Sequence, residues 1–237
     1  MNQQLSDTGI GRHLFNAARL CHEVLQETDA MFHQLGSMFQ STSLNEDGDF
    51  REIKHLDSAC WYEDDSKRIT YGGLMNFAVW MHKEKTNTDP KHCVSVFVQL
   101  YPGHDETPDD PLLVHEALVH VIYSSDGPWT KKDDQPITLS PTKLTGDYWH
   151  DMTDALWCYD HEEERYWVYS FPLTEINSGK DLRRLITKPA SRLIVSSTTL
   201  PNKEEAEAAL RDLPVIRYKV DGNRITVVAP QRLATAG

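Results

Sequence analysis

Apolar side chains recur every three or four residues along the first forty positions, with the spacing of an amphipathic helix. Asp7 or Thr8 can cap such a helix by accepting from the free N–H groups of its first turn. We therefore predict a long helix over about residues 9–40. One apolar row has a period of 3.5 residues and consists of Ile10, Leu14, Ala17, Cys21, Val24, Thr28, Met31, Leu35 and Met38, of which only Thr28 is polar. A second row of Ala18, Leu25, Phe32 and Phe39 repeats every seven residues.

The two rows together form a stripe that is wider than the seam of a two-stranded coiled coil. This width favours a helix that lies across a sheet of the same chain and belongs to its core. The alternative is that part of the helix packs on a second copy of the chain or on another protein. Self-association through residues 9–40 therefore stays open at the level of the sequence.

Beyond about residue 58, apolar positions alternate with polar ones, as they do in half-buried strands. Gly72 and Gly73 predict a hairpin turn, and residues 41–58 predict a loop with a short helical turn. Two short helices are expected, one over 181–187 that ends before Pro189 and one that Asn202 caps. The predicted strands span residues 67–71, 74–82, 93–101, 112–123, 155–160, 165–172, 192–197, 215–220 and 224–229.

The order of these elements predicts an α+β fold, because short turns rather than crossover helices join most of the strands. We expect the long N-terminal amphipathic helix to pack on a mainly antiparallel β-sheet, with a β-α-β-β C-terminal end. A chain of 237 residues suits a single domain, 1–237. The polar connection over 124–146, which contains two glycines and three prolines, is the candidate for an internal boundary.

The chain has a net charge of −12, and this charge is unevenly distributed. Residues 101–180 contain 5 basic and 16 acidic side chains, whereas residues 181–237 contain 10 basic and 6 acidic ones. The acidic centre argues against general nucleic-acid binding, which needs clustered Lys and Arg. It favours a protein partner with a basic surface, reached by electrostatic steering. The simpler alternative is an ordinary solvated surface.

Aromatic residues alternate along the predicted hairpin over 155–172, and acidic residues occupy its tip. Aromatic rings beside charged side chains are typical of protein recognition sites. The candidate binding residues are Trp149, Trp157, Tyr159, Glu162, Glu163, Glu164, Trp167 and Tyr169. The alternative is that the rings belong to the core and only the tip meets solvent. Our leading hypothesis is a soluble, non-catalytic protein that acts by protein–protein interaction, as an inhibitor, immunity protein, adaptor or chaperone.

A second hypothesis is a metal-dependent hydrolase built on the acidic cluster around residues 147–154. On a helical turn, the aspartates of this cluster would share one face with a histidine beside them. Carboxylates placed in this way can bind a divalent ion or raise one another's pKa for acid–base chemistry. The candidate ligands are Asp147, His150, Asp151 and Asp154, with His115 or Glu116 as an additional group. The simpler alternative is a helix cap with a solvated face.

A third hypothesis is binding of nucleic acid or a phosphate group through the basic C-terminal segment. Its candidate contacts are Arg183, Arg184, Lys188 and Arg192, because guanidinium groups bind phosphate in a bidentate manner. No glycine-rich phosphate-binding motif accompanies them in the sequence. The alternative is that these cations pair with the acidic centre of the same chain.

The four cysteines, at positions 21, 60, 93 and 158, lie far apart and form no CxxC pair. This arrangement suggests neither a disulfide framework nor a zinc site, and we expect no cofactor. No apolar run reaches the roughly 20 residues that a membrane helix needs. The first residues lack the basic and apolar regions of a secretory signal. We therefore expect a cytoplasmic protein without a membrane span.

Overall fold

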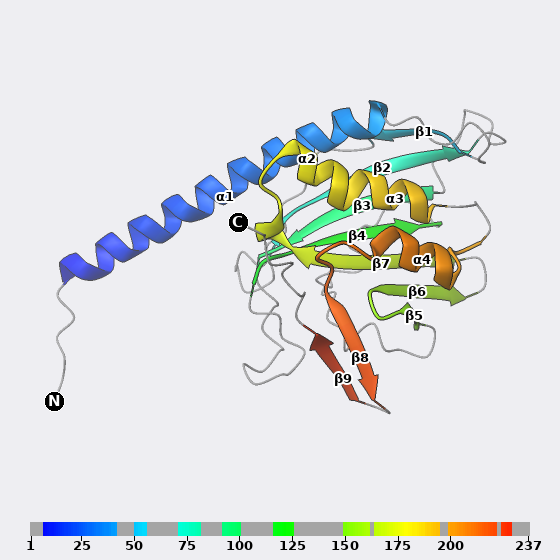
Figure 1. The fold of residues 1–237 in the computed structure, drawn as a ribbon. Helices are drawn as coiled ribbons and strands as arrows, with labels where there is room; N and C mark the ends of the chain where they lie inside the picture. The colour runs from blue at the N-terminus through cyan, green and yellow to red at the C-terminus, as the bar shows by residue number, and fades with distance from the viewer. Residues whose placement is uncertain are drawn as a thin grey trace, which may run out of the picture.

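The computed structural model describes residues 7–41, 50–55, 71–81, 92–100, 116–125, 149–161, 164–194, 199–221 and 224–228. Over these residues the fold is α+β, as predicted (Figure 1). A long N-terminal helix, α1 (Asp7–Ser41), packs on a seven-stranded sheet through its C-terminal half. The helix predicted over 9–40 is thereby confirmed.

All neighbouring strands of the large sheet are antiparallel. In chain order the strands are β1 (Phe50–His55), β2 (Tyr71–Met81), β3 (His92–Gln99), β4 (Leu118–Ser124), β5 (Trp149–Thr153), β6 (Leu156–His161) and β7 (Glu164–Pro172). Their order in the sheet is β1-β2-β3-β4-β7-β6-β5. Strands from both sides of the 124–146 connection therefore share one sheet, while most of that connection lies outside the described residues.

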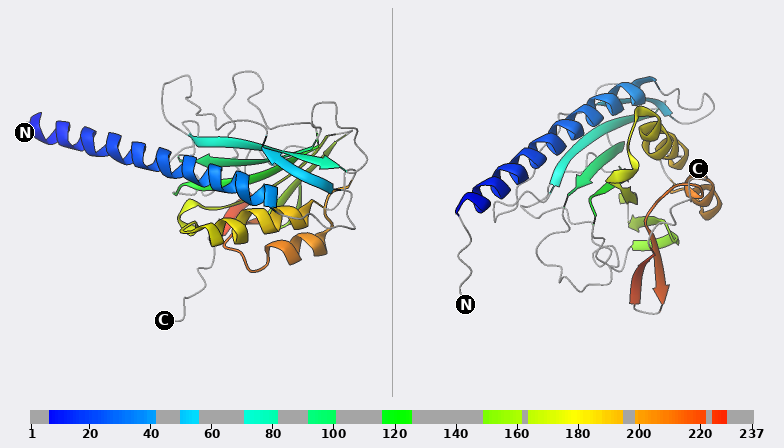
Figure 2. Two further views of the ribbon diagram at one scale, coloured as in Figure 1. Left: turned by 90° about the horizontal axis from the view of Figure 1, so that it is seen from above. Right: turned by 60° about the vertical axis from the view of Figure 1, so that its left-hand side comes forward.

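Short helices form a layer on one face of the sheet, beside the C-terminal half of α1 (Figures 1 and 2). The layer contains the 3-10 turn η1 (Leu173–Glu175), α2 (Gly179–Leu182), the π-helical turn η2 (Arg183–Thr187), α3 (Lys188–Leu193) and α4 (Lys203–Leu210). Asn202 caps α4, as predicted, through reciprocal hydrogen bonds with Glu205. A hairpin of β8 (Arg217–Asp221) and β9 (Arg224–Val228) follows, so the β-α-β-β end consists of β7, the helical layer, β8 and β9.

The core lies between the sheet and the helical layer, because alternate strand residues point toward the helices. The sheet contributes Phe77, Val94, Val96, Val98, Val119, Val121, Tyr123, Trp167, Tyr169 and Phe171, among others. Among the side chains of α1 that the structure describes, those in the core come from its C-terminal half: Met31, Phe32, Leu35 and Phe39. The rings of Phe39 and Phe77 lie 4.6 Å apart between centroids, which fixes this half of α1 on β2.

Gly72 and Gly73 do not form the predicted hairpin turn. Both glycines lie in β2, and the register between β2 and β3 shifts between Tyr71 and Gly73. Glycine suits such a bulge because it has no side chain to accommodate. β2 pairs on its other side with β1, which occupies part of the 41–58 segment predicted to be a loop.

The helix predicted to end before Pro189 continues through this residue to Leu193. The chain widens into the π-helical turn η2 just before, and Pro189 stands in the first turn of α3, where proline is tolerated. Pro189 has no N–H to offer to the carbonyl of Leu185, four residues earlier. The hydroxyl of Tyr169 donates to that carbonyl instead, at 2.8 Å. The first two residues of the strand predicted over 192–197 therefore belong to α3.

Candidate functional site

The aromatic hairpin forms part of the core rather than an exposed recognition face. Trp167 and Tyr169 are 0 % and 1 % exposed and lie beneath the helical layer. Trp157, on the other face of the sheet, is 3 % exposed, and Tyr159 is half-buried. For Trp157, Trp167 and Tyr169 the hypothesis of an exposed aromatic face is therefore wrong and the alternative that the rings are buried is confirmed.

The acidic tip of the hairpin is described only at its two ends. Asp160 is exposed, and its carboxylate pairs with Arg165 across the hairpin at 3.3 Å. Glu164 is half-buried. Outside the described residues lie Glu162 and Glu163, together with the side chain of Trp149. A binding role for this tip stays a prediction.

The acidic cluster around residues 147–154 does not form the predicted helical face. Residues 149–153 form strand β5, which pairs with β6, so the spacing argument for a shared helical face fails. Asp154 lies in the turn after β5, and its carboxylate pairs with Arg217 at 2.6 Å. Outside the described residues lie Asp147 and His115, and also the side chains of His150 and Asp151. Within the described part of the chain, no three His, Cys, Asp or Glu side chains could together hold a metal ion.

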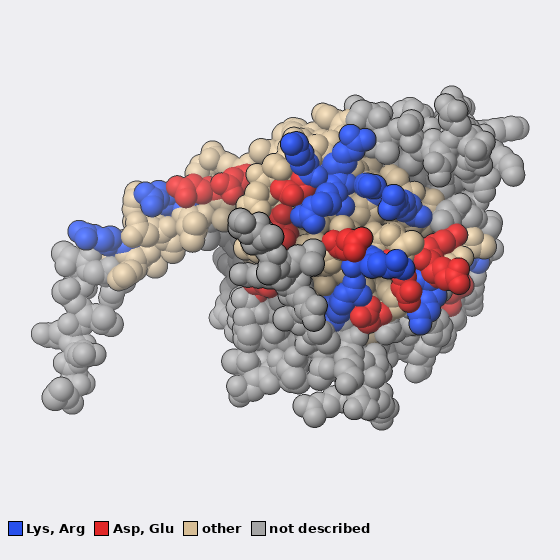
Figure 3. Space-filling view, viewed as in Figure 1, with Lys and Arg blue, Asp and Glu red and all other residues tan. Residues whose placement is uncertain are grey.

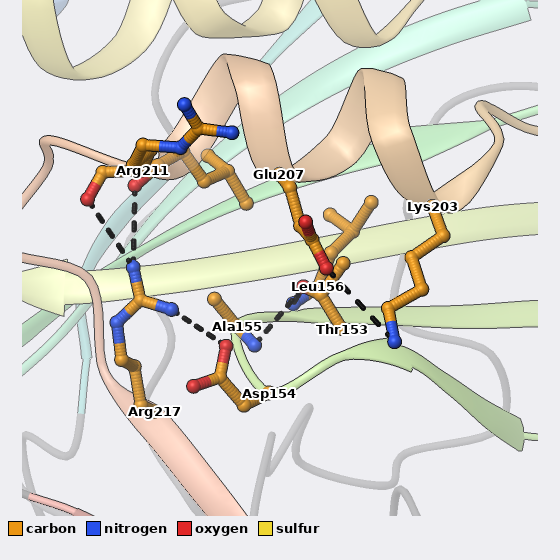
Figure 4. A network of polar contacts seen from close by, with 9 residues as sticks. Thr153, Asp154, Ala155, Leu156, Lys203, Glu207, Arg211 and Arg217 are labelled. Carbon is orange, nitrogen blue, oxygen red and sulfur yellow. Dashed lines mark hydrogen bonds and ion pairs between the residues drawn. The ribbon is translucent and has the colours of Figure 1, made fainter.

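A surface cavity of about 390 Å³ opens beside Asp154 (Figure 4). It is lined by Thr153, Asp154, Ala155, Lys203, Glu207, Leu210, Arg211 and Arg217. The guanidinium of Arg217 binds the Asp154 carboxylate and also donates to two carbonyls at the end of α4, those of Leu210 and Arg211, at 3.5 Å. Lys203 pairs with Glu207 at 3.9 Å. These contacts tie β8 to α4 and to the β5–β6 turn, so the cavity wall is a structural clamp.

A buried polar chain crosses the sheet at His120 on β4. Its Nε2 lies 2.9 Å from Oε1 of Gln99 on β3, and its Nδ1 lies 2.7 Å from Oγ of Ser170 on β7. The Gln99 oxygen accepts from the ring, so Nε2 holds the proton and Nδ1 accepts from the Ser170 hydroxyl. Burial lowers the pKa of His120 to about 3, and the imidazole is therefore neutral at physiological pH.

A serine beside a neutral histidine has the geometry of a nucleophile and its general base. His120 and Ser170 are, however, only 1 % and 5 % exposed, so a substrate cannot reach the hydroxyl in this fold. The two residues also stand directly opposite each other within paired strands. These hydrogen bonds thus satisfy polar side chains that are buried on the face of the sheet away from the helical layer. Cys93 offers no alternative nucleophile, because burial raises the pKa of its thiol to about 12.

The helical layer presents an exposed basic surface, which we call the basic ridge. It consists of Lys180, Arg183, Arg184, Lys188 and Arg192, all of which are exposed. Figure 3 shows this surface as a blue area beside α1. Arg184 pairs with Asp181 at 3.4 Å. Over the described residues, no ion pair joins the ridge to the acidic centre at 101–180, although Arg217 does pair with Asp154.

The N-terminal half of α1 extends beyond the sheet into solvent (Figures 1 and 2). Every residue from 11 to 20 is exposed. The large apolar side chains of Leu14, Phe15 and Leu20 are 66 %, 67 % and 61 % exposed. Full burial begins only at Thr28. We call residues 7–27 the projecting segment.

The apolar stripe of α1 continues from the projecting segment into the core. Leu14 and Leu35 are three heptads apart and therefore lie on the same side of the helix. Thr28 lies at the boundary between the projecting segment and the core. Its hydroxyl donates a hydrogen bond to the Val24 carbonyl of the same helix, at 2.8 Å. The prediction that α1 is a core helix is confirmed for its C-terminal half and wrong for the projecting segment.

Comparison of the chain with protein-family models, with curated proteins and with solved structures finds no match in any of the three. The function must therefore be argued from the surfaces themselves. Within the part of the chain that the structure describes, no helix is both long and apolar enough to span a bilayer. The two candidate surfaces are the projecting segment and the basic ridge.

Proposed function

We propose that this protein is non-catalytic and acts by binding another protein through the projecting segment of α1. The observation that carries the proposal is the exposure of Leu14, Phe15 and Leu20 on a helix whose other half is anchored in the core. Clustered apolar side chains on an exposed surface mark interaction sites in soluble proteins. An adaptor, an inhibitor, an immunity protein or a chaperone could each use a surface of this kind.

The anchoring of the C-terminal half of α1 in the core supports a binding role for the projecting segment. Leu35 and Phe39 hold the C-terminal half rigidly, so the projecting segment leaves the sheet in a defined direction. A partner groove reads a helix through apolar residues three and four positions apart. Glu23 and Glu27 are exposed at the end of the segment nearer the sheet. A partner with a basic rim around an apolar groove would complement both features.

The proposal places the protein in the cytoplasm. Cys93 is a free, buried thiol in the structure, and Cys158 is buried as well. Free thiols are usual in a reducing compartment, whereas secreted proteins of modest size tend to use their cysteines in disulfides.

Affinity capture from native lysate, combined with light scattering, tests the proposed function. The double variant Leu14→Glu/Leu20→Glu places two charges on the apolar face and is expected to release a stoichiometric partner that the wild-type protein retains. The matched control Asn16→Glu/Gln26→Glu adds the same charge at exposed polar positions and is expected to retain it. If the wild-type protein neither retains a partner nor self-associates, the proposed function is rejected.

Binding of a phosphate-bearing ligand at the basic ridge is a second candidate function. The supporting observation is that five cations are exposed over α2, η2 and α3 (residues 179–193), a stretch whose single acid is Asp181. Association of a single-stranded oligonucleotide, followed by fluorescence anisotropy, should weaken steeply as the salt concentration rises. Arg183→Gln and Arg192→Gln should each reduce that salt dependence, and an absence of binding at low salt would eliminate this candidate.

A further inference from the structure

We infer that the projecting segment pairs with the projecting segment of a second copy of this chain, in antiparallel orientation. This inference rests on the proposed function, because it names the partner of the same surface. Its basis is the width, the length and the charge pattern of the segment.

The apolar stripe is narrower on the projecting segment than in the core. In the core half, the second row holds the rings of Phe32 and Phe39, both 1 % exposed. Seven and fourteen residues before Phe32, the same row holds Leu25, which is half-buried, and Ala18, which is exposed. A narrow stripe with small residues suits the seam between two helices, whose axes can approach to about 8–10 Å. The broad stripe, in contrast, meets the sheet and the helical layer.

The length of the segment suits an antiparallel pair. The 21 residues of the projecting segment span about 31 Å at 1.5 Å per residue. With a twofold axis near Arg19, residue 10 of each copy reaches the level of Thr28 in the other copy, where burial by the chain's own core begins. The exposed part of each stripe is then covered along its whole length, and the stripe in the core is left as it is.

The heptad positions define the register of this pair. A twofold axis near Arg19 sets Leu14 opposite Val24 of the second copy, and Ala17 opposite Cys21 of the second copy. Both layers combine the two apolar positions of the heptad, as antiparallel two-stranded packing requires. Leu20 flanks the seam, whereas Phe15 follows Leu14 by about 100° around the helix, faces away from the seam and stays exposed in the pair.

The charge pattern of α1 favours the antiparallel orientation over the parallel one. Arg12 and Arg19 lie in the outer half of the helix, while Glu23, Glu27 and Asp29 lie nearer the sheet. Figure 3 shows this change from blue to red along the helix. With the axis near Arg19, Arg12 of each copy lies near the level of Glu23 and Glu27 of the second copy, whereas a parallel pair sets Arg12 beside Arg12 and each acid beside its equivalent. The helix dipoles also favour the antiparallel pair.

Sedimentation equilibrium over a range of protein concentrations tests the pairing itself. A seam between two helices buries little surface, so we expect a reversible, concentration-dependent dimer. Leu14→Glu is expected to weaken self-association by about tenfold or more, because a carboxylate then faces the apolar seam. Asn16→Glu, two residues away on the opposite side of the helix, should leave it unchanged. Circular dichroism verifies that both variants stay folded.

Distances between spin labels test the orientation. Arg12, Arg19 and Gln26 are exposed and seven residues apart, so one label at each position reads the same side of the helix. The labels require a background in which Cys21 is changed to Ala, which keeps the seam apolar, and Cys60 to Ser, while Cys93 and Cys158 are buried. An antiparallel pair gives the shortest distance for Arg19→Cys, with an axial offset of about 21 Å for Arg12→Cys and Gln26→Cys. A parallel pair gives equal distances at all three positions and would overturn the stated orientation.

The outcomes separate this inference from the proposed function. A wild-type protein that stays monomeric up to high concentration overturns the pairing. If Leu14→Glu/Leu20→Glu nevertheless releases a different protein in the capture experiment, the proposed function stands with another partner. A dimer that Leu14→Glu leaves intact also overturns the inference, because the contact then lies elsewhere.

Discussion

The two halves of α1 have the same apolar repeat but opposite environments. Leu35 is 0 % exposed and Leu14 is 66 % exposed, although the two residues stand at equivalent heptad positions. Leu35 packs in the core between the sheet and the helical layer, whereas Leu14 belongs to the N-terminal half of α1, which extends beyond both (Figure 1). The comparison shows that a heptad repeat identifies an apolar face without saying whether the same chain covers it.

Truncation of these two leucines is expected to give the largest difference in stability between the two halves of α1. Leu35→Ala leaves a cavity in the core and should lower the free energy of unfolding by about 2–5 kcal/mol. Leu14→Ala should change it by less than about 0.5 kcal/mol in dilute, monomeric protein, since the side chain is already in water. Urea denaturation of both variants measures the difference. Equal losses would mean that the projecting segment is covered in the monomer.

The dependence of stability on pH tests the burial of His120 in the sheet. Its pKa is about 3 in the folded chain and near 6.5 when the ring meets water, so between these values only the unfolded chain binds the proton. Stability should therefore fall as the pH decreases from 6.5 to 3, by up to about 1.4 kcal/mol per pH unit.

Urea denaturation across this pH range measures the slope, and the variant His120→Gln should flatten it. His22, which is exposed on the projecting segment, provides the matched control variant His22→Gln. A slope that is the same in wild-type protein and His120→Gln would contradict the burial of a neutral ring.

Tyr169→Phe should have an intermediate effect that is confined to the folded core. The variant keeps the ring but leaves the Leu185 carbonyl without the donor that Pro189 cannot replace. We expect the free energy of unfolding to fall by about 1–3 kcal/mol. Hydrogen exchange should show faster opening of the amides in η2 and α3, with no change in the projecting segment. Unchanged stability would mean that another donor serves this carbonyl.

Asp154→Asn should have the smallest effect, because this ion pair lies at the surface. The Asp154 side chain is 55 % exposed and that of Arg217 is 30 % exposed, so screening by water limits the pair to about 1 kcal/mol or less. The loss should appear as faster hydrogen exchange in β8 rather than in α1. A loss as large as that of Leu35→Ala would show that the clamp supports the whole fold.

Local signals predicted most of the individual elements. The Asn202 cap of α4, the final hairpin and the alternation of Val94, Val96 and Val98 each depend on neighbouring residues, and each is confirmed. The predictions were wrong where residues distant in the sequence determine the local structure. Gly72 and Gly73 lie where the register between β2 and β3 shifts, and the helix continues through Pro189, beside which Tyr169 donates to the Leu185 carbonyl.

The candidate sites were less predictable than the fold, since a site depends on exposure and on contacts between distant residues. The alternation along the hairpin indicated a strongly aromatic strand face, but it could not show that Trp157 and Trp167 lie on opposite faces of the sheet or that both are buried. The sequence neighbours of Asp154 make it a candidate metal ligand under the second hypothesis, whereas its partner in the structure is Arg217, 63 residues later in the chain. The heptad repeat pointed to the projecting segment. It fitted both a core helix and a helix that packs on another chain, and the sequence could not separate the two.

By itself, the sequence determined that α1 is a long amphipathic helix, that antiparallel strands follow it, and that the fold is α+β, because periodicity and caps act over a few residues. Only the tertiary structure decided which half of the apolar stripe is core. The reason is geometric: a helix of 35 residues is longer than the surface that the sheet and the helical layer offer, so Leu35 meets a core while Leu14 meets solvent.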